Sequence, residues 1–304
     1  MQDHNAQVSG RAAYVLGRSR NSAASHRRKL AIQLSALFML VLVLTLCSAA
    51  QQCVAPPNST MVAWFPFDET SGNTTANLAT QNTGTLGGTA TFTSGLVGGA
   101  MHFDGVSAYI DSPSSVATNF GPGVVTGAPC SGLESTCAGA FTIDVWIRVP
   151  TDLTNSVTTI LDKRSGSAPD IHGYSFALSY SRLILQLADG GLNDGFTNYA
   201  SVPITNLKDH NWHHVAVSVT RTIPNGIRWY HNGAALLGQQ IDPTDREGSL
   251  VSDSPLRIGA NTADFPFINW FNGDMDELQI FNRALSGQEI MSIYLAGAGG
   301  QCKH

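Results

Sequence analysis

The sequence has little cysteine and, beyond its first fifty residues, little positive charge. Only five of the 304 residues are cysteine, and no two of them show the Cys-x-x-Cys spacing typical of structural zinc sites. Residues 1–50 hold six of the 17 basic residues but one of the 22 acidic ones, which leaves 11 basic against 21 acidic residues in the remainder. This balance argues against nucleic acid and anionic membrane surfaces as partners. Heptads and repeats with a period of about 20–50 residues are also lacking, which argues against coiled coils and solenoids.

Long apolar runs are scarce as well, and the one clear example is residues 30–46, LAIQLSALFMLVLVLTL. A basic stretch precedes it, and the small residues Ser48 and Ala50 follow it, which together predict a secretory signal cleaved after Ala50. The run is longer than the roughly 7–15 residues typical of a signal and shorter than the roughly 20 of a membrane-spanning helix. An uncleaved membrane anchor and lipid attachment at Cys47 therefore stay open as alternatives.

These features predict three parts of the chain. Residues 1–50 are a signal peptide or membrane anchor, residues 51–60 are a linker, and residues 61–304 are one domain. We expect the domain to be secreted or otherwise extracytoplasmic, or anchored by residues 30–46, and to meet a membrane only through this N-terminal segment. The domain is long enough to bury a large core without a metal or a disulfide.

Four cysteines remain outside the predicted signal, and an even number in an exported chain suggests disulfides. Cys130 and Cys137 lie close together in a loop rich in Gly, Pro and Ser, which favours pairing them with each other. The remaining pair, Cys53 and Cys302, would then join the two ends of the domain, which commonly lie close in space.

Short strands dominate the chain after residue 60. In residues 140–149, AFTIDVWIRV, every second side chain from Phe141 to Val149 is apolar, which predicts a strand with one buried face. Similar segments recur between turns rich in Gly, Asn, Asp and Pro, and two of them are joined at Tyr180-Ser181-Arg182 by what reads as a tight hairpin. This pattern predicts an all-β, two-sheet antiparallel sandwich or jelly roll.

One helix is expected, near the C-terminus. Ser286 and Glu289 form a capping-box pattern, Ile290, Ile293 and Tyr294 share a helical face, and Gly297 can end the helix.

The adjacent histidines of NWHHVAVSVT (211–220) invite a metal or catalytic interpretation. Successive side chains on a strand point to opposite faces, so His213 and His214 cannot chelate one ion together. We therefore expect two core histidines, each hydrogen-bonded to a neighbour.

The same stretch also carries a family resemblance. WHHVAVSVT followed by GIRWYHNG resembles the Trp-His-His-Val-Ala-Val…Tyr-x-Asn-Gly pattern of LamG-like jellyroll domains, which belong to the concanavalin A-like lectin/glucanase superfamily. Further segments resemble the family in the same order: VAWFPFDETSG (62–72), GTLGGTATFTSGLVGGAMHFDG (84–105), FTIDVWIRV (141–149) and FNGDMDELQIFNRALSGQEI (271–290). The resemblance implies two stacked antiparallel sheets in a concanavalin A-like jelly roll, closed by the short helix.

The resemblance also implies a non-catalytic binding or adhesion module that recognises carbohydrate or cell-surface glycoprotein, in some members with one Ca²⁺ at the rim of the sandwich. Calcium takes oxygen ligands, so the candidate ligands are Asp68, Glu69, Asp104, Asp274 and Asp276. Two departures from the family pattern, Asn77 and Ala108, stand where acids are common.

Candidate carbohydrate contacts are aromatic residues beside amides, because sugar rings stack on aromatic faces and their hydroxyls bond planar groups. Two loops offer this combination: Phe267, Asn269, Trp270 and Asn272 in the first, and Asn193, Asp194 and Tyr199 in the second.

Two other functions stay open. A protein-interaction or surface-structural domain without a glycan ligand would show the same pattern. A glycoside hydrolase, the least favoured, needs two carboxyl groups about 5–5.5 Å apart. In DMDEL, strand alternation places Leu278 on the face of Asp274 and Asp276 and turns Glu277 away, so the second catalytic acid is missing.

Overall fold

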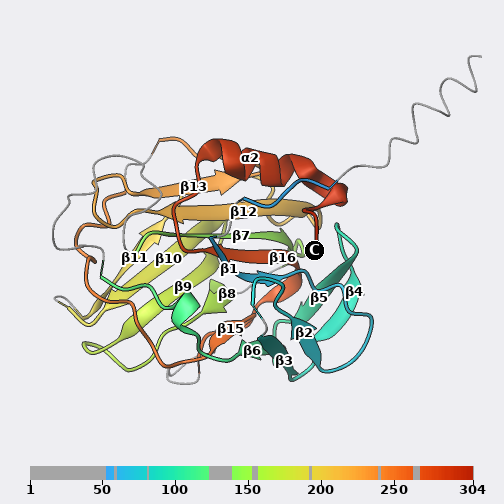
Figure 1. The fold of residues 1–304 in the computed structure, drawn as a ribbon, viewed down its shortest axis with the longest axis horizontal. Coiled ribbons are helices and arrows are strands. Elements are labelled where there is room, and N and C mark those ends of the chain that lie inside the picture. Colours follow the sequence, from blue (N-terminus) through green and yellow to red (C-terminus); the bar gives the residue numbers. More distant parts are fainter. Residues whose placement is uncertain are drawn as a thin grey trace, which may run out of the picture. The chain divides into compact units, whose positions relative to one another are not determined.

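Two antiparallel β-sheets of eight strands each face one another across an apolar core (Figure 1). This arrangement confirms the predicted jelly-roll sandwich. The computed structural model describes residues 53–57, 60–80, 82–122, 139–152, 157–191, 194–238, 241–262 and 268–303, all within the compact unit Cys53–His304. Among the helices so described, none is long and apolar enough to cross a membrane.

The first sheet is built around the long strand β16, which pairs with β7 on one side and with β5 and β1 on the other. Its strands, in spatial order, are β14 (Ala234–Ala235), β13 (Ile227–His231), β12 (Trp212–Val219), β7 (Phe141–Arg148), β16 (Asn272–Phe281), β5 (Gly99–Asp104) and β4 (Thr91–Ser94), with β1 (Met61–Phe65) beside β16.

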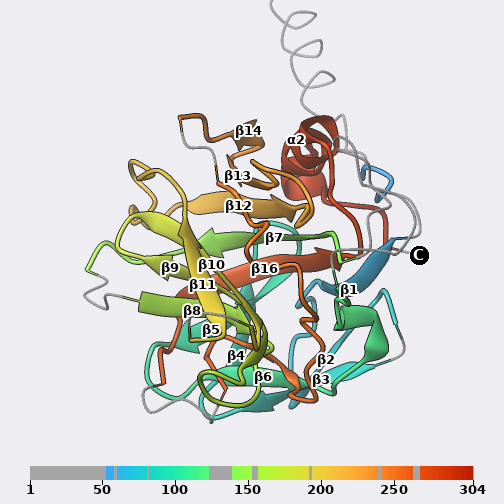
Figure 2. The same cartoon turned by 90° about the vertical axis from the view of Figure 1, so that its left-hand side faces the viewer.

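The second sheet packs against the first on the other side of the core, and its strands β9 to β11 face the viewer in Figure 2. Its strands, in spatial order, are β11 (Phe196–Ala200), β10 (Arg182–Asp189), β9 (His172–Ser179), β8 (Val157–Asp162), β15 (Leu256–Ile258), β6 (Tyr109–Ser112), β3 (Thr83–Gly87) and β2 (Thr74–Ala76). The expected hairpin joins β9 to β10 through Tyr180 and Ser181.

The core lies between the sheets and follows the predicted alternation. The five apolar side chains predicted to share a face of β7 are all fully buried, namely Phe141, Ile143, Val145, Ile147 and Val149. Apolar side chains from β8, β9 and β10 meet them from the second sheet. Burial of this kind stabilises by about 25 cal/mol per Å² of apolar surface, so this face fixes the register of each strand.

The helix α2 (Gly287–Ala296) packs on the outer side of the first sheet, where Ile290 and Ile293 contact a cluster that includes Tyr230 and Phe281. The predicted capping box is present: the Ser286 hydroxyl accepts a bond from the Glu289 backbone N–H, and the Glu289 carboxylate accepts one from the Ser286 N–H. Two short 3₁₀ helices, η1 (Val116–Thr118) and η2 (Gly297–Gly299), complete the elements.

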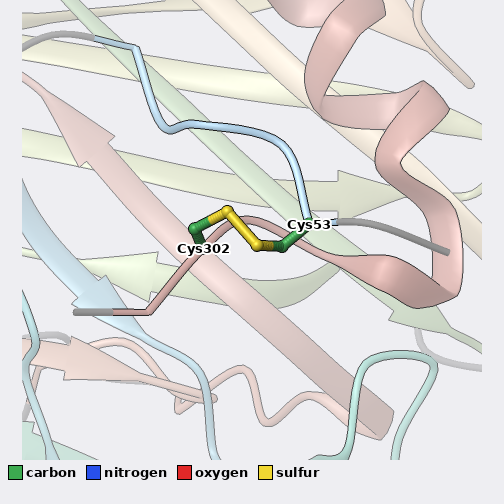
Figure 3. Close-up of a disulfide and its surroundings, with 2 residues drawn as sticks. All are labelled: Cys53 and Cys302. Atoms are coloured by element: carbon green, nitrogen blue, oxygen red, sulfur yellow. A yellow bond between two sulfur atoms is a disulfide. The ribbon is translucent and has the colours of Figure 1, made fainter. Parts of the chain in front are cut away.

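A disulfide joins Cys53 to Cys302, the pair predicted to link the two ends of the domain (Figure 3). The two Cα atoms lie 4.9 Å apart, and the backbone of Val54 and Gln301 forms a parallel bridge beside them. The predicted Cys130–Cys137 pair and the predicted signal or anchor at residues 30–46 lie outside the described residues.

Candidate functional site

A groove of about 360 Å³ opens on the outer face of the second sheet, over the strands β8 to β11. Its lining consists of Val157, Thr159, Arg164, Ser175, Ala177, Ser179, Ile184, Gln186, Asn198 and Asn269. Ten residues from four strands and two loops thus share a concave surface, which is the usual setting of a small-ligand site.

The groove exists because β9 carries small side chains on its outer face. Tyr174, Phe176 and Leu178 point into the core, so the alternating residues Ser175, Ala177 and Ser179 point outward. The opposing residues on β10 are larger, with Ile184 opposite Ala177 and Gln186 opposite Ser175. A strip of small residues between larger ones leaves a trough along β9.

The polar end of the groove is held by a chain of fixed contacts. The carboxylate of Asp162 is fully buried and accepts a bond from Arg164 Nε at 2.9 Å. Arg164 in turn donates to the side-chain oxygen of Gln186, and Gln186 Nε2 donates to Asn198 Oδ1 at 2.8 Å. Because each group is fixed by the next, planar donors and acceptors face the groove without having to be ordered by a ligand.

One wall of the groove includes Asn269, from the segment Ile268–Trp270 that lies beside β8. The carbonyl of Asn269 accepts a bond from Thr159 N–H at 3.4 Å, and the carbonyl of Trp270 accepts one from the Thr158 hydroxyl at 2.7 Å. The half-buried Trp270 ring lies 6.1 Å from the ring of Tyr109. Of the predicted contact residues, Asn269 therefore lines the groove and Trp270 is its neighbour in sequence.

The other predicted contact residues lie elsewhere. The prediction that Tyr199 contacts a carbohydrate was wrong. Its ring lies in the core, because β11 turns Tyr199 inward and the exposed Asn198 outward. Asn272 pairs with Asp104 between β16 and β5 of the first sheet, and Asp194 lies in the turn before β11. Phe267 and Asn193 are outside the part of the chain that the structure describes.

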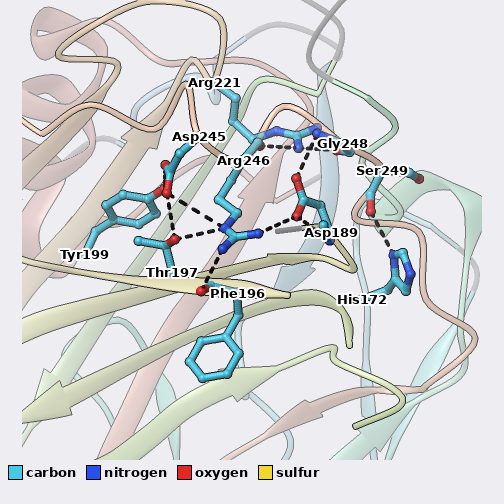
Figure 4. Close-up of polar contacts among 11 residues, drawn as sticks. His172, Asp189, Phe196, Thr197, Tyr199, Arg221, Asp245, Arg246, Gly248 and Ser249 are labelled. Atoms are coloured by element: carbon cyan, nitrogen blue, oxygen red, sulfur yellow. Dashed lines mark hydrogen bonds and ion pairs between the residues drawn. The ribbon is translucent and has the colours of Figure 1, made fainter. Parts of the chain in front are cut away.

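A buried arginine network holds the loop of residues 241–250 against β10 and β11 (Figure 4). Arg246 donates to Thr197 Oγ1 and Asp189 Oδ1, both at 2.9 Å, and to the carbonyl of Phe196 at 3.0 Å. The Tyr199 hydroxyl donates to Asp245 in the same loop. This network explains the fixed position of β11, whose outer face supplies Asn198 to the groove.

The five predicted calcium ligands are not gathered into one site. Within the described ranges, no three acidic, histidine or cysteine side chains are grouped so that they could hold a metal ion. Asp68 bonds Gly99 N–H and Lys303, and Glu69 bonds the N–H of Ala76. The prediction of bound calcium gains no ligand set here and stays a prediction.

Asp104 illustrates how these acids are used instead. Its Oδ1 accepts bonds from the N–H groups of Val106, Ser107 and Ala108, and its Oδ2 accepts one from Thr89. Burial acts to raise the pKa of Asp104, but these hydrogen bonds outweigh it and hold the pKa well below its usual range. A charged carboxylate already surrounded by donors is stabilised without a cation.

A β-bulge changes the expected order of side chains at the end of β16. Glu277 has φ 52°, and the pairing with β7 shifts between Asp276 and Gln279. As a result the Leu278 side chain lies in the core between the sheets. Glu277 lies on the opposite face of β16, where it is still buried and accepts a 2.6 Å bond from Trp64 Nε1. The predictions that Leu278 shares the face of Asp276 and that Glu277 is turned away from that face were both wrong, because strict alternation does not hold across a bulge.

Asp276 and Glu277 are both buried acids. Asp276 accepts bonds from the N–H groups of Leu96 and Val97, yet burial raises its pKa to about 8, and the neighbouring charge of Glu277 adds to this. Burial likewise raises the pKa of Glu277, although Lys303 at 2.6 Å acts in the opposite direction. Near this cluster a second hollow of about 630 Å³ opens between the Asp68–Thr70 loop and the edge strand β4.

The adjacent histidines point to opposite faces, as predicted. His213 contacts Asp209 through Nε2 and His231 through Nδ1, both at 2.9 Å. The ring nitrogens of His214 find no hydrogen-bond partner among the described residues, although Nε2 lies 3.5 Å from the buried Asp144. His214 instead packs edge-on against Trp146 at 5.2 Å. The pair therefore serves packing, and only His213 has the predicted hydrogen bonds.

Sequence reasoning missed Arg164, Ser175, Gln186 and Asn198 as groove residues. For Ser175 and Gln186 the signal was present as polar residues at alternate positions of otherwise apolar strands, in YSFALSY and RLILQLADG, whereas Arg164 and Asn198 lie outside these segments. Which of these positions converge depends on the register of four strands, as in the pairing of Gln186 with both Ser175 and Asn198.

Known proteins with similar sequences or structures identify the family of this chain. A family model described as "Concanavalin A-like lectin/glucanases superfamily" matches residues 122–291, more than half of the chain. The chain belongs to this superfamily, as the sequence motifs suggested. No curated protein matches the sequence.

Solved structures with a similar fold are named as binding domains of bacterial toxins. The binding domain of Paraclostridial Mosquitocidal Protein 1 has a TM-score of 0.56 at 14% identity and covers 77% of this chain. The receptor binding domain of botulinum neurotoxin C/D mosaic serotype has a TM-score of 0.54 at 15% identity and covers 79%. The binding domain of botulinum neurotoxin DC in complex with SialylT has a TM-score of 0.54 at 12% identity and covers 78%.

The match spans about half of each of these structures, from 51% to 52% of their length. At such identities the likeness shows the fold alone.

Proposed function

We propose that this chain is a non-catalytic binding module that holds a carbohydrate in the groove over β8 to β11. The observation that carries the proposal is the groove itself: a trough of small residues flanked by the planar polar groups of Arg164, Gln186 and Asn198. Planar amides and a guanidinium bond vicinal hydroxyls with fixed geometry, and the trough admits a flat ring.

The chemistry of the lining favours binding over hydrolysis. None of the ten lining residues of the groove is Asp or Glu. The nearest acid in the polar chain, Asp162, is fully buried and bonded to Arg164, so it is not available to protonate a glycosidic oxygen. Hydrolysis by either stereochemical route uses two carboxyl groups that flank the scissile bond.

The toxin binding domains add support for the class of partner. One of them is named in complex with SialylT, so sialylated glycans belong on any panel that tests this chain. We infer that the ligand is a glycan or a glycosylated surface, and that calcium is a separate question to be tested with and without chelator.

An extracytoplasmic location fits this role. The Cys53–Cys302 disulfide is typical of oxidising compartments. We propose that the domain acts outside the cytoplasm, either released by cleavage or held by residues 30–46.

The test is a glycan array probed with the full chain and with a variant that fills the groove. Ala177→Leu adds bulk to the floor, where the Ala177 side chain is 6% exposed. Ala235→Leu is the matched control, because Ala235 is exposed on β14 of the other sheet. We expect Ala177→Leu to lose glycan binding and Ala235→Leu to keep it.

Equal binding by both variants would refute the groove as the site. Binding of the unaltered chain to none of the glycans, with or without calcium, would favour the protein-interaction alternative.

A further inference from the structure

Tyr180 adopts a backbone conformation that favours other residues. It is the first of the two turn residues between β9 and β10, and its φ is 54°, in the left-handed region. Two-residue hairpin turns favour Gly, Asn or Asp where φ is positive, because a Cβ there is crowded by the backbone. Turn chemistry therefore does not account for a tyrosine at this position.

Packing does not account for it either. One other aromatic residue among the described residues, Phe67, has a positive φ of 59°, and its side chain is fully buried in the core. The Tyr180 side chain is 66% exposed and makes no hydrogen bond or ring contact with the rest of the described chain. The fold gains from the strained Phe67 but gains little from the strained Tyr180. A strained, exposed side chain of this kind is a reason to look for a function.

Tyr180 lies next to one end of the groove. Ser179, the residue immediately before Tyr180, lines the groove, and it pairs with Val157 of β8, which also lines it. From Ser175 to Ser179 the trough runs along β9 for about 13 Å, at 3.3–3.4 Å per residue. The end of the trough at Ser179 therefore lies next to the hairpin that carries Tyr180.

We propose that Tyr180 is a sugar-stacking residue that extends the groove at this end, so that the ligand is an oligosaccharide rather than a single sugar ring. The proposal rests on the groove being a carbohydrate site. A tyrosine suits the task, because its ring packs on the apolar face of a pyranose while its hydroxyl stays in water. It also has only two side-chain torsions to immobilise, which keeps the entropic cost of contact low.

The experiment compares four variants of the full chain, and one of them, Gln186→Ala, removes a polar group of the groove itself. Tyr180→Gly removes the ring and suits the backbone, and Tyr180→Phe keeps the ring. Asn225→Gly is the matched control, because Asn225 has φ 60° in the loop between β12 and β13 of the other sheet. The probes are the best oligosaccharide from the glycan array, cut to a trisaccharide, and its terminal monosaccharide, both titrated by calorimetry. Thermal unfolding of each variant is recorded in parallel.

We expect Tyr180→Gly to unfold at the same temperature as the unaltered chain or higher, while its affinity for the trisaccharide falls about tenfold. Its affinity for the monosaccharide should not change. Tyr180→Phe should stay within about fivefold of the unaltered chain, and Asn225→Gly should bind normally.

Each other outcome overturns the proposal. If Gln186→Ala loses trisaccharide binding and Tyr180→Gly keeps it, the groove stands and the role of Tyr180 is refuted. A lower unfolding temperature for Tyr180→Gly at unchanged affinity would show that the ring serves the fold. A chain that binds no glycan would refute both this proposal and the function on which it rests.

Discussion

Removing Lys303 should lower the stability of the fold, because Glu277 would then be buried without a positively charged partner. Lys303 Nζ lies 2.6 Å from Glu277 Oε1 and also pairs with Asp68. Only 5% of the Glu277 side chain is exposed, against 26% of Lys303. The substitution Lys303→Met keeps the apolar stem and removes the positive charge, which leaves a carboxylate buried beside a second acid, Asp276.

The magnitude follows from the burial of the two partners. Breaking a fully buried ion pair by removing one partner costs about 3–5 kcal/mol. Because a quarter of Lys303 is exposed and solvent screens the pair, we expect about 2 kcal/mol near pH 8. In a domain of this size that loss lowers the unfolding temperature by about 4–8 °C.

The loss should depend on pH. Burial already raises the pKa of Glu277, and Lys303 opposes the rise, so the variant has a folded-state pKa that is higher still. A group whose pKa is raised on folding loses its stabilising contribution as pH rises from the unfolded-state value through the folded-state value. The deficit of Lys303→Met should therefore be small near pH 5 and full near pH 8.

Thermal unfolding at both pH values, read by circular dichroism, measures this deficit. Adding Glu277→Gln to Lys303→Met removes the buried charge and should restore at least half of the loss at pH 8. A deficit that is equal at both pH values, or that Glu277→Gln leaves untouched, would refute the reasoning.

Four further predictions follow from other parts of the fold. Arg221→Met should cost about 3 kcal/mol in urea unfolding, because the buried guanidinium donates to the carbonyls of four loop residues, Gly121, Gly139, Arg246 and Gly248. Ser286→Ala should cost about 1 kcal/mol in the same assay by removing the capping box of α2. Cys302→Ser should cost about 2–5 kcal/mol, and Cys53→Ser should reproduce the loss. Asp276→Asn should flatten the pH profile of stability between about pH 4 and 8, because the raised pKa of Asp276, about 8, makes the unaltered chain lose stability as pH rises through this window.

The sequence predicts those parts of the fold that depend on local periodicity. The alternation of Phe141, Ile143 and Val145 marks the buried face of β7, and Ser286 with Glu289 marks the start of α2. Such signals are local, because neighbouring positions on one element alone decide which side chains share a face. The disulfide between Cys53 and Cys302 could also be predicted, because the two ends of a domain commonly lie close together.

The site depends on information that local patterns lack. The phase of the alternation in β11 decides that Asn198 faces the groove and Tyr199 the core, and periodicity alone cannot choose between them. The bulge at Glu277 likewise turns Leu278 inward without a warning in the sequence. Convergence of Arg164 with Gln186 and Asn198 requires the four strands β8 to β11 in register, which is a long-range property.

The bond between Cys53 and Cys302 also bears on mechanical load. Any force on the chain before Cys53 enters the domain where the two chain segments are covalently joined and where Val54 bridges Gln301. The load is thereby divided between the segment leading to β1 and the segment leaving α2, so that β1 is not peeled from β16 one hydrogen bond at a time. A domain pulled from the side of Cys53 would then resist the force as a unit, and breaking this disulfide would let β1 separate from β16 one hydrogen bond at a time.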